Sequence, residues 1–246
     1  MIIPTMGEEL RVIIIGANGG IGTALIDHLS ASDQVAQIYA LSRQGKPHKS
    51  HKVVNMVFDF TKEDDLEKTS AALKAHGDFD LIILATGFLH NPSITPEKTY
   101  RSLTFEGLEM NFRVNTIGPA MTAKYFLPLL RRDRKTIFAA LSARVGSISD
   151  NGIGGWYAYR ASKAALNMVI KTLAIEQRRR SKDTIILGLH PGTVDTNLSK
   201  PFQANVAEGK LFTPEYASLK LLNVIDKADQ SDSGHLIDWA GKQIPF

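Results

Sequence analysis

Short apolar runs alternate along the chain with longer segments in which apolar residues recur at every third or fourth position. Leu10–Ile15 is rich in β-branched residues and ends at a glycine, which is typical of a parallel strand buried on both faces. Beyond the glycines, Ile21, Leu25 and Leu29 mark the apolar face of a helix. The pattern predicts seven strands, at residues 10–15, 35–41, 53–58, 81–85, 136–141, 184–189 and 235–239.

Helical segments separate most of these strands and lie at residues 63–75, 105–130, 156–179 and 214–226. The alternation predicts right-handed crossovers and a parallel sheet covered by helices on both faces. No repeat or low-complexity linker interrupts the order, and 246 residues suit one large domain. We therefore expect an α/β fold of three layers with a doubly wound, mainly parallel, seven-stranded sheet, in a single domain over residues 1–246.

Composition and charge exclude several classes of protein. Apolar residues make up 43% and charged residues 22% of the chain, a balance that can bury a core and differs from that of disordered chains. The net charge of +4 comes from 29 basic and 25 acidic residues. Two basic clusters, residues 131–135 and 178–182, follow predicted helices, where cations are favourable. We expect them to be solvated helix ends and not a nucleic-acid surface.

The sequence lacks several features, and their absence limits the types of chemistry and the cellular location that we expect. The chain has no cysteine, which excludes disulfides, thiolate catalysis and cysteine-bound metals. No basic segment precedes the first apolar run, and the most apolar stretch, residues 81–89, is shorter than the roughly 20 residues that cross a bilayer. His48 and His51 have no third ligand nearby, so we expect no metal. The expectation is a cytoplasmic protein without a membrane or nucleic-acid partner.

The first strand joins the first helix through a glycine-rich turn at residues 16–22. Gly16 permits a tight turn, Gly20 lets the backbone approach a pyrophosphate, and Gly22 lets the helix pack close to the sheet. The amides of the helix N-terminus then face the anion, so the turn predicts nucleotide binding. The contacts are expected from Gly16, Asn18, Gly19, Gly20, Ile21 and Gly22.

The end of the second strand indicates which nicotinamide dinucleotide is bound. An acid there would bond the ribose 2′-hydroxyl of NAD, whereas an arginine accepts the 2′-phosphate of NADP. Ser42 and Arg43 stand there with no acid, which favours NADP(H), although Arg43 could instead be an exposed loop residue. Asp59, after the third strand, either accepts the adenine amino group or caps a helix that begins near Thr61.

Four residues carry the candidate chemistry. Tyr159 and Lys163 lie four residues apart on a predicted helix, so they share a face. A free phenol has a pKa of about 10, and a nearby ammonium lowers that pKa and brings proton transfer into range, although such pairs also occur by chance. Ser142 ends a central strand, where it can bond a substrate oxygen. Asn115 either bonds the backbone or holds a water that relays the proton past Lys163.

The whole chain resembles the short-chain dehydrogenase/reductase family, because these motifs occur in order and are followed by Pro191-Gly192-Thr193-Val194-Asp195-Thr196. Residues 142–163 are most similar to the C-factor-like and sniffer-like carbonyl reductases. The resemblance implies a Rossmann-type fold and hydride transfer between NADP(H) and a small carbonyl or alcohol substrate, with Tyr159 as general acid/base. It also implies cofactor contacts from Phe60, Ala85, Thr86, Gly87, Asn115, Tyr159, Lys163, Pro191, Gly192, Val194 and Thr196.

Two positions depart from the pattern of the family. Many members have Asn-Asn-Ala-Gly after the fourth strand, whereas residues 84–87 here read Leu-Ala-Thr-Gly. Many members also carry two adjacent serines at the active site, of which the second is catalytic, whereas Ser142 is followed by Ala143. A catalytic serine must therefore be Ser142, or else Ser147 or Ser149, and we expect Ser142 because it ends the strand.

The leading functional hypothesis is an NADP(H)-dependent oxidoreductase. The alternative is an NAD(P)-binding signalling or regulatory protein of the C-factor type, against which the intact Tyr159 and Lys163 weigh. An epimerase or dehydratase needs a longer C-terminal domain than the 55 residues (246 − 191) that follow Pro191. Residues 197–212 predict an apolar lid, and the apolar surface of the two long helices predicts a homodimer or homotetramer.

Overall fold

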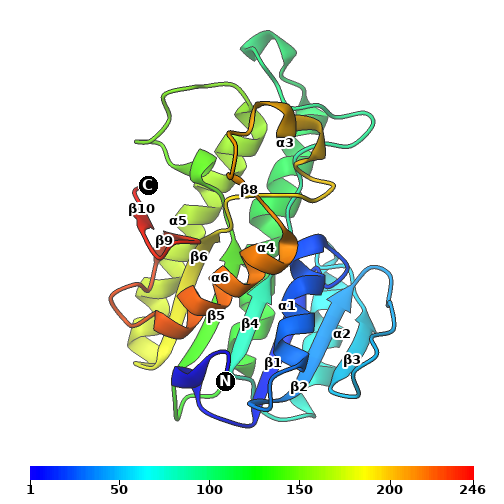
Figure 1. Ribbon diagram of the computed structural model, residues 1–246, viewed down its shortest axis with the longest axis vertical. Helices are drawn as coiled ribbons and strands as arrows, with labels where there is room; N and C mark the ends of the chain where they lie inside the picture. The colour runs from blue at the N-terminus through cyan, green and yellow to red at the C-terminus, as the bar shows by residue number, and fades with distance from the viewer.

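An eight-stranded sheet runs through the molecule, with helices packed on both of its faces (Figure 1). The structure is a computed structural model that describes residues 1–246, apart from the side chain of Asn205. The strands of the sheet are β1 Leu10–Ile15, β2 Val35–Ser42, β3 Val53–Val57, β4 Leu81–Leu84, β5 Thr136–Leu141, β6 Thr184–His190, β9 His235–Asp238 and β10 Gln243–Ile244. A separate pair joins β7 Thr193–Val194 to β8 Leu211–Phe212.

The strand order is β3-β2-β1-β4-β5-β6-β9-β10, so successive strands are added outward on one side of β1 up to β3 and on its other side from β4 onward. In doubly wound sheets, ligands bind outside the carboxyl ends of the strands at such a switch point. The seven parallel strands agree with the sequence-based prediction. The eighth strand, β10, was not predicted; it pairs antiparallel with β9 through only two residues, which is too short to leave a periodic pattern.

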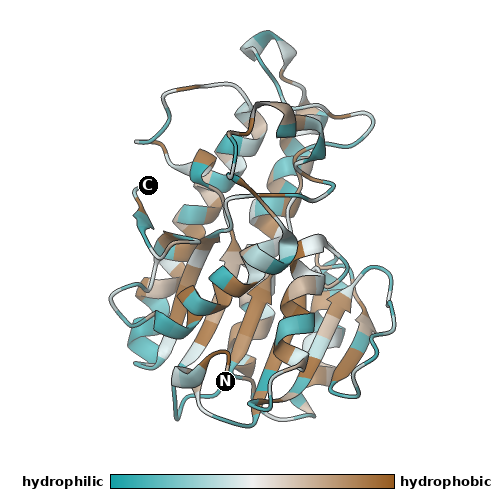
Figure 2. Ribbon diagram, viewed as in Figure 1, coloured by the Kyte–Doolittle hydropathy of each residue, from teal (hydrophilic) through white to brown (hydrophobic). Residues whose placement is uncertain are grey.

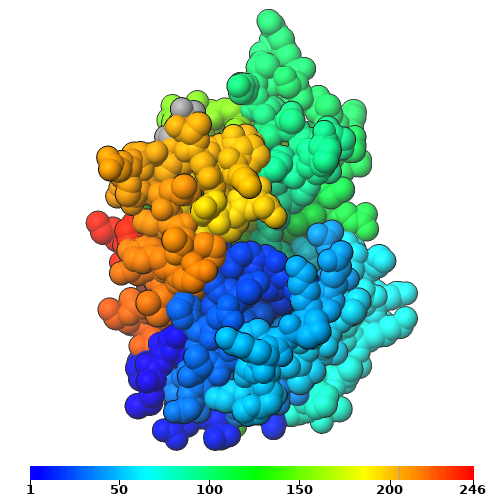
Figure 3. All heavy atoms as spheres, turned by 45° about the vertical axis from the view of Figure 1, so that its right-hand side comes forward, coloured from blue at the N-terminus to red at the C-terminus, as the bar shows by residue number. Residues whose placement is uncertain are grey.

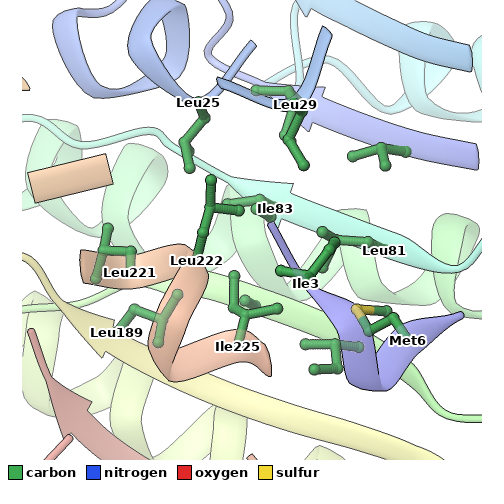
Figure 4. Packing of buried hydrophobic residues seen from close by; sticks show 14 of the residues in the cluster. Ile3, Met6, Leu25, Leu29, Leu81, Ile83, Leu189, Leu221, Leu222 and Ile225 are labelled. Atoms are coloured by element: carbon green, nitrogen blue, oxygen red, sulfur yellow. The ribbon is translucent and has the colours of Figure 1, made fainter. Parts of the chain in front are cut away.

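The central strands are mostly apolar because both faces of the sheet are buried there (Figure 2). Within β1, Val12 and Ile14 belong to the core beneath α1 and α6, whereas Ile13 and Ile15 belong to the core on the opposite face. Figure 4 shows the first of these cores, in which Leu25 and Leu29 of α1 and Leu222 of α6 meet residues of the sheet. The helices are α1 Gly20–Ser30, α2 Glu63–Lys74, α3 Phe105–Phe112, α4 Gly118–Phe126, α5 Tyr157–Arg180 and α6 Pro214–Lys227. None of the helices in the described chain combines the length and apolarity needed to cross a membrane.

The helix predicted over residues 105–130 is interrupted. α3 ends at Phe112, a π-turn spans Arg113–Ile117, α4 follows, and a 3-10 turn closes the segment at Leu127–Leu129. Pro119 explains part of the irregularity, because proline has no N–H to donate to the carbonyl of Asn115, four residues earlier. The π-turn therefore coincides with a residue that we predicted to be functional.

The basic cluster after the fourth helix is more than a solvated helix end. At the edge of the sheet opposite the carboxyl ends, Arg134 Nη2 lies 2.6 Å and Arg131 Nη1 3.5 Å from Asp80 Oδ1. The Asp80 carboxylate is buried and also accepts the main-chain N–H of Arg11 at 2.8 Å. The prediction for this cluster was wrong in that respect, since its partner Asp80 lies 51 and 54 residues away from the two arginines in the sequence.

Candidate active site

The glycine turn has the geometry that its sequence predicts. Gly16 has a φ of +87°, and a Cβ atom on it would lie 2.6 Å from the carbonyl oxygen of Ala85. A Cβ atom on Gly22 would lie only 2.2 Å from the carbonyl oxygen of Gly16. α1 begins at Gly20, and its N-cap, Gly19, has no side chain to occupy the amides of the first turn. The turn thus leaves bare backbone at a helix N-terminus, which fits a pyrophosphate.

The loop after β2 is held by two hydrogen bonds to one carbonyl. Ser42 Oγ donates to the carbonyl oxygen of Gln44 at 2.8 Å, and Asn18 Nδ2 from the glycine turn donates to the same oxygen. Arg43, which lies between Ser42 and Gln44 in the sequence, is exposed. The structure therefore places Arg43 beside the glycine turn with its guanidinium in solvent. Ser42 Oγ is already bonded within the loop.

Asp59 lies at the carboxyl end of β3, near Arg43. Burial alone would raise the pKa of Asp59, but hydrogen bonds from Thr61 and the charges of Lys62 and Arg43 lower it overall. Asp59 Oδ1 accepts the Thr61 N–H at 3.1 Å and the Thr61 hydroxyl at 2.7 Å. α2 begins at Glu63 with Lys62 as its N-cap, so of the two alternatives for Asp59 the structure does not show the helix cap. Phe60 packs against α4, where a Cβ atom on Gly118 would overlap its ring.

The segment after β4 connects the glycine turn to the candidate catalytic residues. The main chain of Ala85 and the methyl group of Thr86 both border Gly16. A Cβ atom on Gly87 would lie 3.9 Å from both Asn115 Oδ1 and Lys163 Nζ. The residues that replace the usual Asn-Asn-Ala motif therefore still bring the two halves of the site together.

Asn115 braces three elements with its side-chain amide. Its Oδ1 accepts the N–H of Phe88 at 2.8 Å, and its Nδ2 donates to the carbonyl oxygen of Phe88 at 2.8 Å and to Ser162 Oγ at 3.0 Å. Asn115 Nδ2 also lies 3.3 Å from Asn111 Oδ1. Of the two predicted roles, these contacts fit backbone bonding. Both amide hydrogens have protein acceptors within the described chain, which leaves none to hold a relay water.

Tyr159 and Lys163 share one face of α5, as predicted. Lys163 Nζ lies 5.8 Å from the centre of the Tyr159 ring and donates to the carbonyl oxygen of Leu141 at 2.8 Å. Burial raises the pKa of Tyr159 to about 12 and lowers the pKa of Lys163 to about 7. Burial has the dominant effect on the phenol in this structure, so the lowering of its pKa by Lys163 stays a prediction.

The Ser142 side chain is hydrogen-bonded to α5, one turn beyond Lys163. Its hydroxyl donates to Asn167 Oδ1 at 2.6 Å, and Asn167 Nδ2 donates to the carbonyl oxygen of Gly146 at 3.3 Å. Ser142 and Asn167 are both buried. It is Ala143 that packs beside Tyr159, in an apolar cluster with Leu89. The assignment of the substrate-binding hydroxyl to Ser142 stays a prediction, and this hydrogen bond counts against it.

The segment that follows β6, part of which was predicted to be a lid, gathers on the surface beside the N-terminal part of the chain (Figure 3, yellow to orange). The two-residue pair of β7 and β8 joins the start of this segment to its end, and Gly192, with a φ of +78°, packs against the ring of Phe212. Thr196 borders Gly20, where a Cβ atom would lie 2.8 Å from the threonine methyl group. The predicted stretch of Pro191, Gly192, Val194 and Thr196 thus runs past the glycine turn.

Rings and aliphatic side chains surround Tyr159. The ring of Trp156 lies 6.2 Å from that of Tyr159 and 5.0 Å from that of Phe202 in the lid. His90 lies edge-on to Phe202 at 5.5 Å. Sequence reasoning missed Trp156 and His90, although Trp156 stands three residues before Tyr159, a spacing that puts two side chains on the same side of a helix. In the part of the chain that the structure describes, no three histidine or acidic side chains are grouped as metal ligands.

The fold and the glycine turn are typical of the dinucleotide-binding oxidoreductases. The model of the family described as short chain dehydrogenase matches residues 11–207, so the chain belongs to that family, as the motifs predicted. The 1-hydroxy-2-glutathionyl-2-methyl-3-butene dehydrogenase of Rhodococcus sp. (strain AD45) is 30% identical over 225 residues, covering 91% of this chain and 93% of that protein. The C-signal protein of Myxococcus xanthus is 32% identical over 142 residues, covering 58% of this chain and 80% of that protein.

Among solved structures, the NADPH-bound carbonyl reductase from chicken fatty liver has the same fold. Its TM-score is 0.83 at 23% identity, and the match covers 98% of this chain and 100% of that one.

Proposed function

We propose that this protein is an NADP(H)-dependent oxidoreductase that interconverts a carbonyl compound and an alcohol, with Tyr159 as the general acid/base. One observation carries the proposal: the segment after β4 contacts both the glycine turn and the candidate catalytic residues, two motifs that lie far apart in the sequence. Gly87 borders Lys163 and Asn115 on one side, and the adjoining residues Ala85 and Thr86 border the glycine turn on the other. A dinucleotide seated on the turn therefore extends toward the Tyr159 phenol.

The residues of the turn fit the cofactor that the family uses. The uncapped amides of α1 and the bare backbone at Gly16 and Gly20 would hold the pyrophosphate, and the segment from Pro191 to Thr196 would cover it. A bound nicotinamide supplies or accepts the hydride. Preference for NADP(H) follows from the exposed Arg43 at the end of β2 and from the absence of an acid at that position.

Tyr159 is suited to give a proton to the substrate oxygen. A phenol whose pKa is raised to about 12 keeps its proton at neutral pH and transfers it only to an oxygen that becomes strongly basic, as a reduced carbonyl does. Lys163, held by the carbonyl of Leu141, lies beside the ring, and its charged form would stabilise the phenolate once the proton has left. Asn115 is a positioning residue, because its amide holds the Phe88 loop against α5.

The proposal is tested by following NADPH oxidation with a panel of aldehydes and ketones, and by comparing the protein with Tyr159→Phe. The variant loses the transferable proton and keeps the ring, so we expect kcat/KM to fall by roughly 10²–10⁴-fold with an unchanged Kd for NADPH. Native turnover by Tyr159→Phe would overturn the role of the phenol. Tight NADPH binding without turnover of any carbonyl compound would instead favour a binding protein, the alternative suggested by the similarity to C-signal.

A further inference from the structure

We infer that the substrate is a flat, uncharged carbonyl compound that carries an aromatic ring next to the reacting carbon. The inference rests on the proposed function and concerns the wall around Tyr159. We call this wall the aromatic wall and define it as Trp156, Phe202, His90, Leu89, Ala143 and Leu198. Its members come from the loop after β4, the end of β5, the start of α5 and the lid, so four separate segments converge on one phenol.

The position of Trp156 is maintained at a conformational cost. Trp156 has a φ of +51° and a ψ of 45°, a left-handed conformation that is unfavourable for any residue other than glycine. Its main-chain N–H donates to the carbonyl of Glu97, and the buried Glu97 carboxylate accepts the N–H of Ala158 at 3.2 Å. A strained conformation persists only where its surroundings enforce it, and such sites cluster around ligands. The two hydrogen bonds to Glu97 hold this strained backbone, and with it the indole ring, three residues before Tyr159.

Phe202 completes the wall from the lid. Its ring meets Trp156 at an interplanar angle of 61°, the edge-to-face arrangement that aromatic rings prefer. His90 Nε2 donates to the carbonyl oxygen of Leu198 at 3.2 Å and so fastens the lid to the loop after β4. Tyr159 is only 8% exposed under this lid. A substrate must displace part of this cover to reach the phenol, and a flat ring that enters between Trp156 and Phe202 replaces their mutual contact with two new aromatic contacts.

The charged groups near the aromatic wall already have partners. Arg160 Nε donates to the carbonyl of Gly155 at 2.9 Å, and Arg144 lies 3.2 Å from Asp150 and 3.6 Å from Asp238. Lys163 is bonded to Leu141. A carboxylate or phosphate on the substrate would lose its hydration, and to pair with Arg160 or Lys163 it would have to displace a hydrogen bond to the main chain. In the same way, Ala143 beside Tyr159 offers only a methyl group. The wall therefore selects by shape and apolarity.

The test compares two methyl ketones with the same number of carbon atoms, acetophenone and cyclohexyl methyl ketone, which differ in the flatness of the ring. We expect the protein to prefer acetophenone in kcat/KM, and Phe202→Leu to reduce that preference by roughly 2- to 12-fold, the size of one aromatic contact. Phe202→Tyr keeps a ring and should retain the preference. Phe105→Leu is the matched control, because Phe105 is 87% exposed on α3. A second comparison uses 4-acetylbenzoate and 4-methylacetophenone, and we expect the charged ketone to be the poorer substrate.

The outcomes separate this inference from the proposed function. If NADPH is oxidised with carbonyl compounds but cyclohexyl methyl ketone equals or exceeds acetophenone, the substrate class is wrong and the proposed function stands. Equal losses for both ketones in Phe202→Leu, or better turnover of 4-acetylbenzoate than of its methyl counterpart, would also overturn the substrate class. If no carbonyl compound is reduced while NADPH still binds, the proposed function itself fails.

Discussion

Replacing Ser142 by alanine distinguishes two roles for that serine. The Ser142 hydroxyl and its acceptor Asn167 are 4% and 2% exposed, and their hydrogen bond is 2.6 Å long. Ser142→Ala leaves Asn167 Oδ1 buried without this donor, which costs about 1–3 kcal/mol of the free energy of unfolding. For a protein of this size, each kcal/mol corresponds to about 2–4 °C in Tm, so we expect Tm to fall by about 2–12 °C.

The two roles predict opposite results in stability and in catalysis. A serine that holds the substrate oxygen would be expected to cost about 10²–10³-fold in kcat when removed, with little change in Tm. If Ser142 instead positions Asn167, its replacement should lower Tm and reduce kcat/KM, measured well below Tm, by less than about tenfold. Thermal unfolding and NADPH oxidation on the same preparation decide between them. An unchanged Tm together with a hundredfold loss of activity would refute the structural reasoning.

Two further variants control the comparison. Ser149 is exposed, and its hydroxyl donates to the carbonyl of Phe246 at 2.8 Å, so Ser149→Ala should change Tm little. Asn167→Ala removes the acceptor of the same hydrogen bond. The double variant with Ser142→Ala should therefore lose less stability than the sum of the two single variants. Strict additivity would mean that the hydrogen bond contributes no coupling.

Four further predictions concern the cofactor, the turn, Lys163 and assembly. Arg43→Ala should weaken NADPH binding by about 1.5–3 kcal/mol and NADH binding far less, and calorimetric titration giving equal losses would contradict the NADP preference. Gly22→Ala forces a Cβ atom to within 2.2 Å of the Gly16 carbonyl, so it should cost about 1–3 kcal/mol of stability and weaken nucleotide binding, which unfolding and titration measure. In the protein without nucleotide, the free energy of unfolding should rise from about pH 7 to 10. Lys163, with its pKa lowered to about 7, is neutral when folded over that range but binds a proton when unfolded, and Lys163→Met should remove the rise in denaturant titrations. Light scattering at micromolar concentration should give two or four times the chain mass of 27.0 kDa, and a monomer mass would contradict the predicted oligomer.

The sequence predicts best what depends on neighbouring residues. The glycine turn and the Tyr159–Lys163 pair are local patterns, and the structure gives them the expected geometry. The bond between Ser142 and Asn167 spans 25 residues and cannot be inferred from either residue alone. Glu97 was missed for the same reason, because it supports α5 from a distant loop. The raised pKa of Tyr159 depends on total burial, which follows from the packing of several segments.

The π-turn at Arg113–Ile117 makes the length of its segment matter as much as its composition. Removing one residue there would rotate everything on one side of it by about 100°. Either Asn115 would lose Phe88 and Ser162, or α4 would turn its buried residues Thr122 and Phe126 away from the sheet. Surface loops commonly accept insertions and deletions. Residues 105–126 should accept substitutions on their exposed face but neither insertions nor deletions. The length of this segment sets the position of Asn115 relative to the buried face of α4.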